Sequence, residues 1–141
     1  MESNQTKKYS RVLTATELRR RAEIIYYGAK VVVYTDDYAH FSEMKPETAR
    51  RLISEGFANP EDSQNGAPTF EQMTAFCESH PGFVLEGYVI GAYREDARVT
   101  ADAIKGPAAD ESALRAFTNR FRPADEFYCD EHSDECYCWY D

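Results

Sequence analysis

Residues 83–104 read FVLEGYVIGAYREDARVTADAI, and this stretch decides the class of fold. Its first ten residues and its last seven are rich in β-branched and aromatic side chains, which favour strands. Three charged residues and Ala97, at positions 94–97 between them, predict a turn, so the stretch is expected to form an antiparallel hairpin. Gly87 and Gly91 in the first strand indicate a β-bulge or the close approach of another backbone segment.

The flanking sequence adds helices and a second hairpin. Two helices are expected to begin at capping boxes, one formed by Thr14 with Glu17 and one by Thr69 with Gln72. The three basic residues 19–21 are expected on the wet side of the first helix. The predicted helices cover 14–28, 46–56, 69–80 and 110–122, and the further predicted strands are 30–35, 125–129 and 135–140.

These elements predict an α+β fold in one domain, with a mainly antiparallel sheet of about five strands and three to four helices packed on it. The length of 141 residues also fits a single domain. Residues 1–13 show little periodicity and are expected to be a loose segment before a domain at 14–141. Because 30–35 is so apolar, it is predicted to be the buried central strand, and 36–45 is predicted to be a loop.

The overall charge argues against one class of function, direct binding of nucleic acid. Lys and Arg total 16 against 25 Asp and Glu, which gives a formal net charge of −9. Direct nucleic-acid binding is not expected, because such affinity comes mainly from cationic groups that neutralise phosphates. No apolar run is long enough for a membrane span, and the first eight residues lack the apolar run of a signal peptide. A cytoplasmic protein is therefore expected, with no indication of its oligomeric state.

Acidic residues are concentrated at the C-terminus. The last seventeen residues hold seven Asp and Glu and no Lys or Arg, interleaved with aromatic residues. Disordered tails are poor in aromatics, so this segment is predicted to be folded. Tyr and Trp are enriched at binding hot spots. The predicted partner-binding residues are Asp130, Glu131, Asp134, Glu135, Tyr137, Trp139 and Tyr140.

The leading interpretation is a non-catalytic protein-interaction domain that presents this acidic, aromatic-bearing surface to a basic protein, as an inhibitor or anti-defence protein mimicking nucleic acid would. A role of the charge in solubility alone stays open. The alternative is a small ligand-binding domain or enzyme with its site near the long polar loop 57–68. No catalytic residue is assigned: Cys77 and His80 lie three apart on one helix, a geometry that rarely activates a thiol, and Cys77 is expected in the core.

Four residues near the C-terminus carry the ligand types of a zinc site. Cys129, His132, Cys136 and Cys138 match a Cys3His set, although the spacing differs from the usual C-x2-C pairs. Plain packing of these cysteines is favoured, and no cofactor is expected, with zinc kept as an alternative. A disulfide is disfavoured because the cytoplasm keeps thiols reduced.

In its general features the chain is similar to small accessory proteins of bacterial mobile elements. The features that carry this likeness are the capped helix pair, the stretch 56–62 ahead of Pro68 and Thr69, and the acidic ending rich in Cys and Trp. None of them is a motif with chemical content. The likeness implies a binding role.

Overall fold

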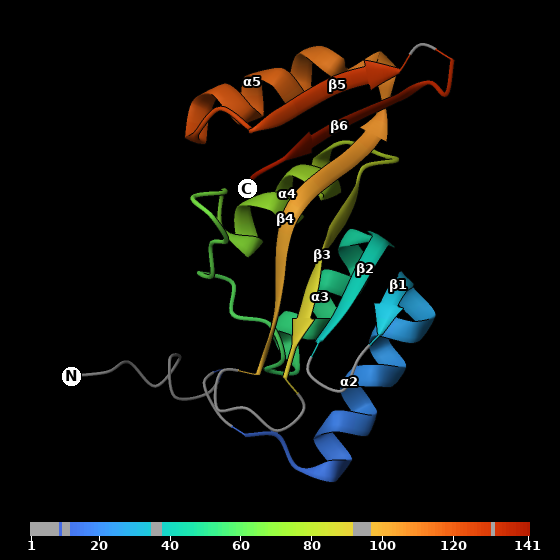
Figure 1. Ribbon diagram of the computed structural model, residues 1–141, viewed down its shortest axis with the longest axis vertical. Coiled ribbons are helices and arrows are strands. Elements are labelled where there is room, and N and C mark those ends of the chain that lie inside the picture. The colour runs from blue at the N-terminus through green and yellow to red at the C-terminus, as the bar shows by residue number, and fades with distance from the viewer. Residues whose placement is uncertain (1–8, 10–11, 35–37, 92–96, 131) are drawn as a thin grey trace, which may run out of the picture.

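The computed structural model describes residues 9, 12–34, 38–91, 97–130 and 132–141, and within these ranges the chain forms four α-helices and one six-stranded sheet (Figure 1). The strands follow the order β1-β2-β3-β4-β6-β5, and all neighbours are antiparallel. The prediction of a single α+β domain is confirmed, with six strands rather than five. The elements are α2 (Ala15–Gly28), β1 (Lys30–Tyr34), β2 (Tyr38–Met44), α3 (Pro46–Ser54), α4 (Phe70–Ser79), β3 (Val84–Ile90), β4 (Arg98–Pro107), a short 3-10 turn (Ala108–Asp110), α5 (Glu111–Phe121), β5 (Glu126–Asp130) and β6 (Glu135–Trp139).

The four described helices pack on the same face of the sheet. One core cluster contains buried residues of every one of them together with the inward residues of the strands. At the β5–β6 end, α5 joins α4 through Phe117 and Phe76, whose ring centroids lie 4.6 Å apart. The opposite face has no helix of the described chain over it, and we call it the uncovered face. The helical contributors to the core include Ile24, Leu52, Met73 and Leu114.

Both predicted capping boxes are present. The Thr14 hydroxyl accepts the backbone N–H of Glu17 at 3.1 Å, and the Glu17 carboxylate accepts the backbone N–H of Thr14 at 2.9 Å. Thr69 and Gln72 make the same reciprocal pair at the start of α4.

Arg21 is buried, at 6 % exposure, so the expectation that it lies on the wet side of α2 is wrong.

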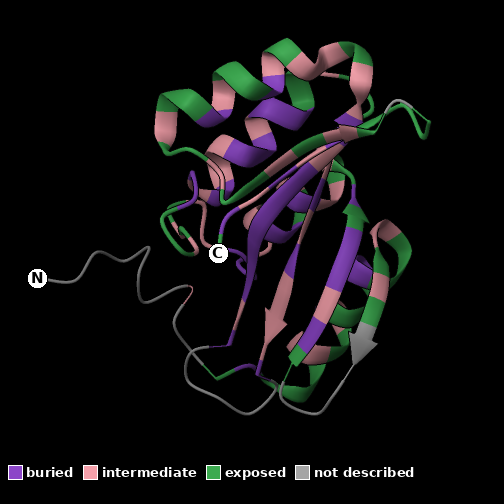
Figure 2. Cartoon of the chain, turned by 45° about the horizontal axis from the view of Figure 1, so that its top comes forward, coloured by how far each residue is buried: buried purple, intermediate pink, exposed green. Residues whose placement is uncertain are grey.

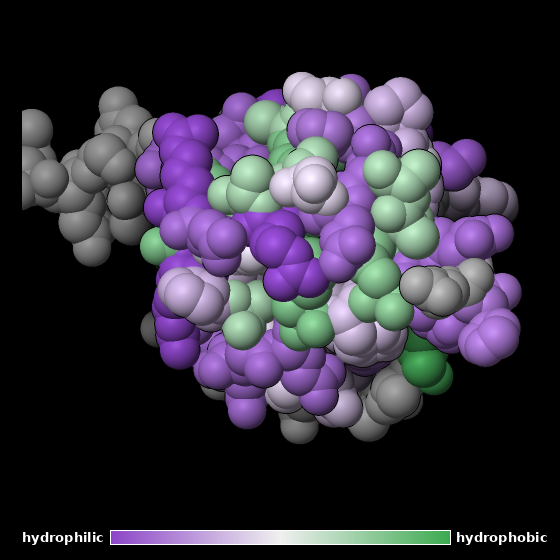
Figure 3. Space-filling view, turned by 90° about the horizontal axis from the view of Figure 1, so that it is seen from above, coloured by the Kyte–Doolittle hydropathy of each residue, from purple (hydrophilic) through white to green (hydrophobic). Residues whose placement is uncertain are grey.

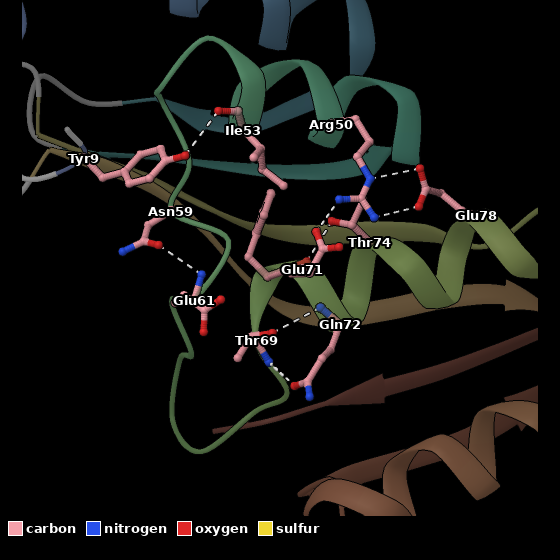
Figure 4. Close-up of polar contacts among 11 residues, drawn as sticks. Tyr9, Arg50, Ile53, Asn59, Glu61, Thr69, Glu71, Gln72, Thr74 and Glu78 are labelled. Atoms are coloured by element: carbon pink, nitrogen blue, oxygen red, sulfur yellow. Dashed lines mark hydrogen bonds and ion pairs between the residues drawn. The ribbon is translucent and has the colours of Figure 1, made fainter. Parts of the chain in front are cut away.

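An ion-pair network joins α3 to α4 (Figure 4). Arg50 donates to both carboxylate oxygens of Glu78, at 3.0 and 2.8 Å, and also pairs with Glu71. The Arg50 guanidinium lowers the pKa of the Glu78 carboxyl. These contacts hold the two helices that flank the loop 57–68.

The prediction that 30–35 forms the central strand is wrong. Among the described strands, β1 lies at the edge of the sheet and pairs with β2 alone, and Val32 is 54 % exposed at a register shift between Val31 and Val33. The expected loop 36–45 contains β2 instead. β4 lies inside the sheet and is buried along most of its length (Figure 2). An apolar β-branched run predicts a strand, but the position of that strand depends on its long-range pairings.

The register of β3 and β4 shifts at Gly87. Glu86 pairs with Ala103 and Gly87 pairs with Ala101, so Asp102 is an extra residue on β4. A Cβ on Gly87 would lie 2.0 Å from the backbone oxygen of Thr100, a distance that no side chain tolerates. The prediction of a bulge or a close backbone approach at Gly87 is therefore confirmed.

The hairpin of β5 and β6 is cross-linked by a disulfide. Cys129 lies directly opposite Cys136 in the ladder, and the two form the bond with a Cα–Cα distance of 4.1 Å. The expectations that these two cysteines only pack and that a disulfide is disfavoured are therefore wrong. They rested on an assumed reducing compartment, whereas the register of β5 and β6 places the two thiols directly opposite each other. Cys77 and Cys138 are free and buried.

Removal of this disulfide should lower the free energy of unfolding by about 2.5 kcal/mol, because the bond closes a short loop in the unfolded chain. Urea unfolding with and without a reductant measures the loss. A Cys129→Ser, Cys136→Ser double variant is the control: it should match the reduced wild type and not respond to reductant. Equal stability of the oxidised and reduced wild type would contradict this prediction.

Candidate binding surface on the uncovered face

Strand alternation places acidic and aromatic side chains together on the uncovered face. Residues opposite one another in neighbouring strands share a face. One row across the sheet contains Glu86, Ala103, Trp139 and Glu126, from β3, β4, β6 and β5. The row beside it toward the hairpin turn contains Val84, Lys105, Tyr137 and Tyr128, and a further row contains His40, Tyr88 and Thr100.

Aromatic rings lie on both sides of β4. On β2 and β3 the ring centroid of Tyr88 lies 5.2 Å from His40 and 6.0 Å from Tyr38. On β5 and β6 the centroids of Tyr128 and Tyr137 lie 5.3 Å apart. Between these two groups, β4 contributes Thr100 and Ala103 to this face, and Lys105 toward the hairpin turn.

Two carboxylates hold aromatic side chains in place. The hydroxyl of Tyr137 donates to Glu86 at 3.1 Å, and the indole N–H of Trp139 donates to Asp102 at 3.2 Å. Burial, and then the charge of Asp102, raises the pKa of Tyr88, which lies two residues from Glu86 on the same face of β3. We call Glu86, Tyr88, Asp102, Tyr137 and Trp139 the carboxylate–aromatic cluster.

Asp102 is the most perturbed acid of this cluster. It is only 2 % exposed. Desolvation raises the pKa of its carboxyl to about 6, against the opposing effects of the Trp139 hydrogen bond and the charge of His40. Asp102 shares the uncovered face with Thr100, two residues before it on β4, and the bulge opposite Gly87 keeps the next residue, Ala103, on that face as well, in the row of Trp139.

The turn between β5 and β6 is acidic and exposed. Asp130, Asp134 and Glu135 are all exposed, and Asp130 accepts the backbone N–H of His132 at 2.9 Å, which lowers its pKa. Lys105 lies 3.9 Å from Glu135 and offsets part of this charge. Seen from above, the α5 and hairpin end of the molecule is mainly hydrophilic, with small separate apolar spots (Figure 3).

The structure separates the predicted partner-binding residues into two groups. Tyr137 and Trp139 are half-buried on the uncovered face, next to the exposed acids of the turn. Tyr140 is completely buried, because alternation places it on the core side with Cys136 and Cys138, so its assignment to the binding surface is corrected. Glu131 lies outside the described residues.

The zinc alternative does not fit this arrangement. The sulfurs of Cys129 and Cys136 are bonded to each other, Cys138 is buried, and His132 is exposed in the turn. Among the described residues, no three His, Cys, Asp or Glu side chains form a group that could hold a metal ion.

Cys77 lies in the core, as the sequence predicts. It is 2 % exposed, and desolvation raises the pKa of its thiol far above the ordinary value, which removes the thiolate that a nucleophile needs. His80 stacks on Phe76 with centroids 4.1 Å apart, and its Nδ1 lies 2.9 Å from the Phe76 carbonyl. Neither residue has the environment of a catalytic group.

Among the hollows of the described structure, two lie close to residues of the candidate sites. One of about 350 Å³ is lined by residues of the loop 57–68, including Asp62 and Gln64, and by Arg98 of β4. Burial raises the pKa of Asp62, against the charge of Arg98. The other, of about 520 Å³, lies at the hairpin end and is lined in part by Val84, Lys105 and Glu135.

Sequence reasoning did not identify Glu86, Asp102, Tyr88 or Tyr128 as site residues. Glu86 and Tyr88 flank Gly87, so the bulge signal already marked their neighbourhood. Asp102 stands in a run of small residues, and only the register of β4 shows that its side chain reaches Trp139.

The chain matches no protein-family model, and no curated protein or solved structure is significantly similar to it. No helix in the described part of the chain is long and apolar enough to cross a bilayer. Since these comparisons give no related protein, the function is inferred from the geometry of the uncovered face.

Asp102→Asn should stabilise the protein at neutral pH. The carboxyl pKa is about 6 in the fold against an ordinary value of 3.8, so the folded state binds the proton more tightly than the unfolded state. The contribution of Asp102 to stability is then greatest below about pH 4 and falls as the pH rises to about 6. Asn keeps an acceptor for the Trp139 indole, so the variant should gain up to roughly 3 kcal/mol at pH 7 and nothing near pH 3.

Trp139 is the only tryptophan, so its fluorescence reports this titration directly. Emission of the folded wild type should change with a midpoint near pH 6, and the Asp102→Asn variant should lack this transition. A His40→Gln variant is the control, since it removes the nearby imidazole and should keep the transition. If the His40→Gln control lost the transition and Asp102→Asn kept it, the transition would belong to His40 and the prediction would be contradicted.

Proposed function

We propose that the protein is a non-catalytic interaction domain that binds a basic protein partner through an acidic hairpin surface. This surface consists of residues on or next to the uncovered side of β5 and β6, at the end of the sheet beside α5. Its members are Glu126, Tyr128, Asp130, Asp134, Glu135, Tyr137 and Trp139.

One observation carries the proposal: the cross-strand pairs of the hairpin place acid opposite acid and ring opposite ring. Asp130 pairs with Glu135, and Tyr128 pairs with Tyr137. Like charges directly opposite one another destabilise a hairpin, and a basic partner would relieve this repulsion. Tyr128 is 54 % exposed, and large exposed aromatic side chains are favoured at interface hot spots.

The charge also indicates the kind of partner. An acidic face attracts a basic protein from a distance and speeds the encounter, and it can occupy a groove made for nucleic acid. This supports an inhibitor or anti-defence role against a nucleic-acid-binding protein. Neither role requires a catalytic residue in this chain.

Neutralising the turn should weaken binding of the partner by about tenfold or more, since three charges of the surface are lost. The variant carries Asp130→Asn, Asp134→Asn and Glu135→Gln, and the amide introduced at position 130 would keep an acceptor for the turn. Its matched control removes the same charge at exposed acids elsewhere, with Glu23→Gln, Glu47→Gln and Glu61→Gln. Affinity capture from host lysate at low and high salt, with circular dichroism as a folding check, measures the effect.

Wild type and the matched control should retain the same protein and release it in high salt, while the turn variant should fail to retain it. Equal losses in both variants, or capture that ignores salt, would contradict the proposal. The acidic residues would then serve solubility.

The hollow beside the loop 57–68 supports a second candidate, a small-ligand-binding domain. It places Asp62, with its raised pKa, and Gln64 in a cavity of about 350 Å³. A ligand there should slow hydrogen exchange in residues 57–68, and Asp62→Asn should reduce the effect. A metabolite library that leaves exchange in the loop unchanged would retire this candidate.

A further inference from the structure

We infer that the carboxylate–aromatic cluster binds an arginine side chain of the partner, stacked on its aromatic rings and paired with Glu86. This inference rests on the proposed function, because it names the group by which the partner is held next to the acidic hairpin surface. The acidic hairpin surface lies on β5, β6 and the turn between them. The cluster extends it with a subsite on β3, β4 and β6.

The rings and acids of the cluster are positioned by the sheet itself. Glu86 and Trp139 lie on either side of Ala103 in one row, so only a methyl group separates them across β4. Tyr137 donates to Glu86 from the neighbouring row, and Tyr88 follows Glu86 on the same face of β3, opposite Thr100 of β4. A guanidinium bound here would have the Glu86 carboxylate and the rings of Tyr137 and Trp139 within the width of the strands β3, β4 and β6.

The two carboxylates retain acceptor capacity. An ionised carboxylate has about four acceptor positions, and the Tyr137 hydroxyl and the Trp139 indole N–H each occupy one, on Glu86 and Asp102 respectively. Glu86 is half-buried and so can meet an incoming donor directly. Asp102 is buried and contributes its negative charge from within the sheet.

Asp102 is a costly residue for a purely structural role. Asn would keep the hydrogen bond from Trp139 without a buried charge, whereas the carboxylate destabilises the fold at neutral pH. Buried groups with perturbed pKa values gather at functional sites, where binding benefits from them. An incoming cation would offset the desolvated charge of Asp102.

The cluster favours arginine over lysine. A guanidinium is planar, stacks on aromatic rings and presents five donors in a fixed fork, while an ammonium is compact and more strongly hydrated. Beside a nearly inaccessible carboxylate, the weaker hydration of arginine lowers the cost of binding.

The test uses Trp139 fluorescence of the full chain, titrated with the blocked tripeptide Gly-Arg-Gly. Its citrulline analogue, which has the same shape without the charge, is the control ligand, and Gly-Lys-Gly tests the preference. The arginine peptide should bind at least about tenfold more tightly than the citrulline peptide, with lysine between them. Equal responses to arginine and citrulline would overturn the inference.

Variants separate the contributions of charge and ring. Glu86→Gln should weaken arginine binding about tenfold and Asp102→Asn about fivefold, and the latter variant folds more stably than wild type at neutral pH. Tyr88→Leu should weaken binding about fivefold, whereas Tyr88→Phe, which keeps the ring, should stay within about twofold. The control with Glu23, Glu47 and Glu61 neutralised should bind like wild type. Unchanged affinity in Glu86→Gln and Tyr88→Leu would also overturn the inference.

The two proposals fail in different ways. If neutralising the turn abolishes capture of the partner while the arginine peptide binds no better than citrulline, the interaction domain stands and the arginine subsite is wrong. If the peptide binds as expected while capture of the partner ignores the turn, the acidic hairpin surface is wrong.

Discussion

The close contact between Gly87 and the backbone of β4 is the constraint on which the candidate site depends. Only a residue without a side chain lets the Thr100 carbonyl approach so closely, and the resulting bulge adds Asp102 to β4 without a partner on β3. Simple alternation from Thr100 would keep Asp102 on the uncovered face but would turn Ala103 into the core. The bulge keeps both residues on the uncovered face, so that Ala103 pairs with Trp139 while the Asp102 carboxylate accepts the Trp139 indole N–H.

The four described helices lie on one side of the sheet, and this leaves the other side to carry the candidate site. Each helix buries its apolar side chains in the same core, so the other face is left to polar and aromatic residues. Six strands then bring distant parts of the sequence into one row, such as Glu86 beside Trp139. The combination of a one-sided core with an antiparallel sheet generates a broad surface that belongs to no single segment.

Local chemistry made part of this structure predictable. The capping boxes at Thr14 and Thr69 and the bulge at Gly87 depend on neighbouring residues, and the sequence predicts all three. The edge position of β1 depends on long-range pairing, and β2 was missed because aromatic residues such as Tyr38 and Phe41 lie on both of its faces. For the site, the exposed acids of the turn were accessible to sequence reasoning. The burial of Tyr140, the disulfide and the role of Asp102 required the register.

The disulfide has a consequence for the integrity of the molecule. Cys129 and Cys136 bracket the acidic turn, which is the part of the hairpin most accessible to a protease. A cut within that turn would leave the two pieces covalently joined, with β6 still held between β4 and β5. A nicked molecule would therefore keep its mass, apart from one added water, until a reductant separated the fragments, and the strand that carries Tyr137 and Trp139 would outlast the turn beside it.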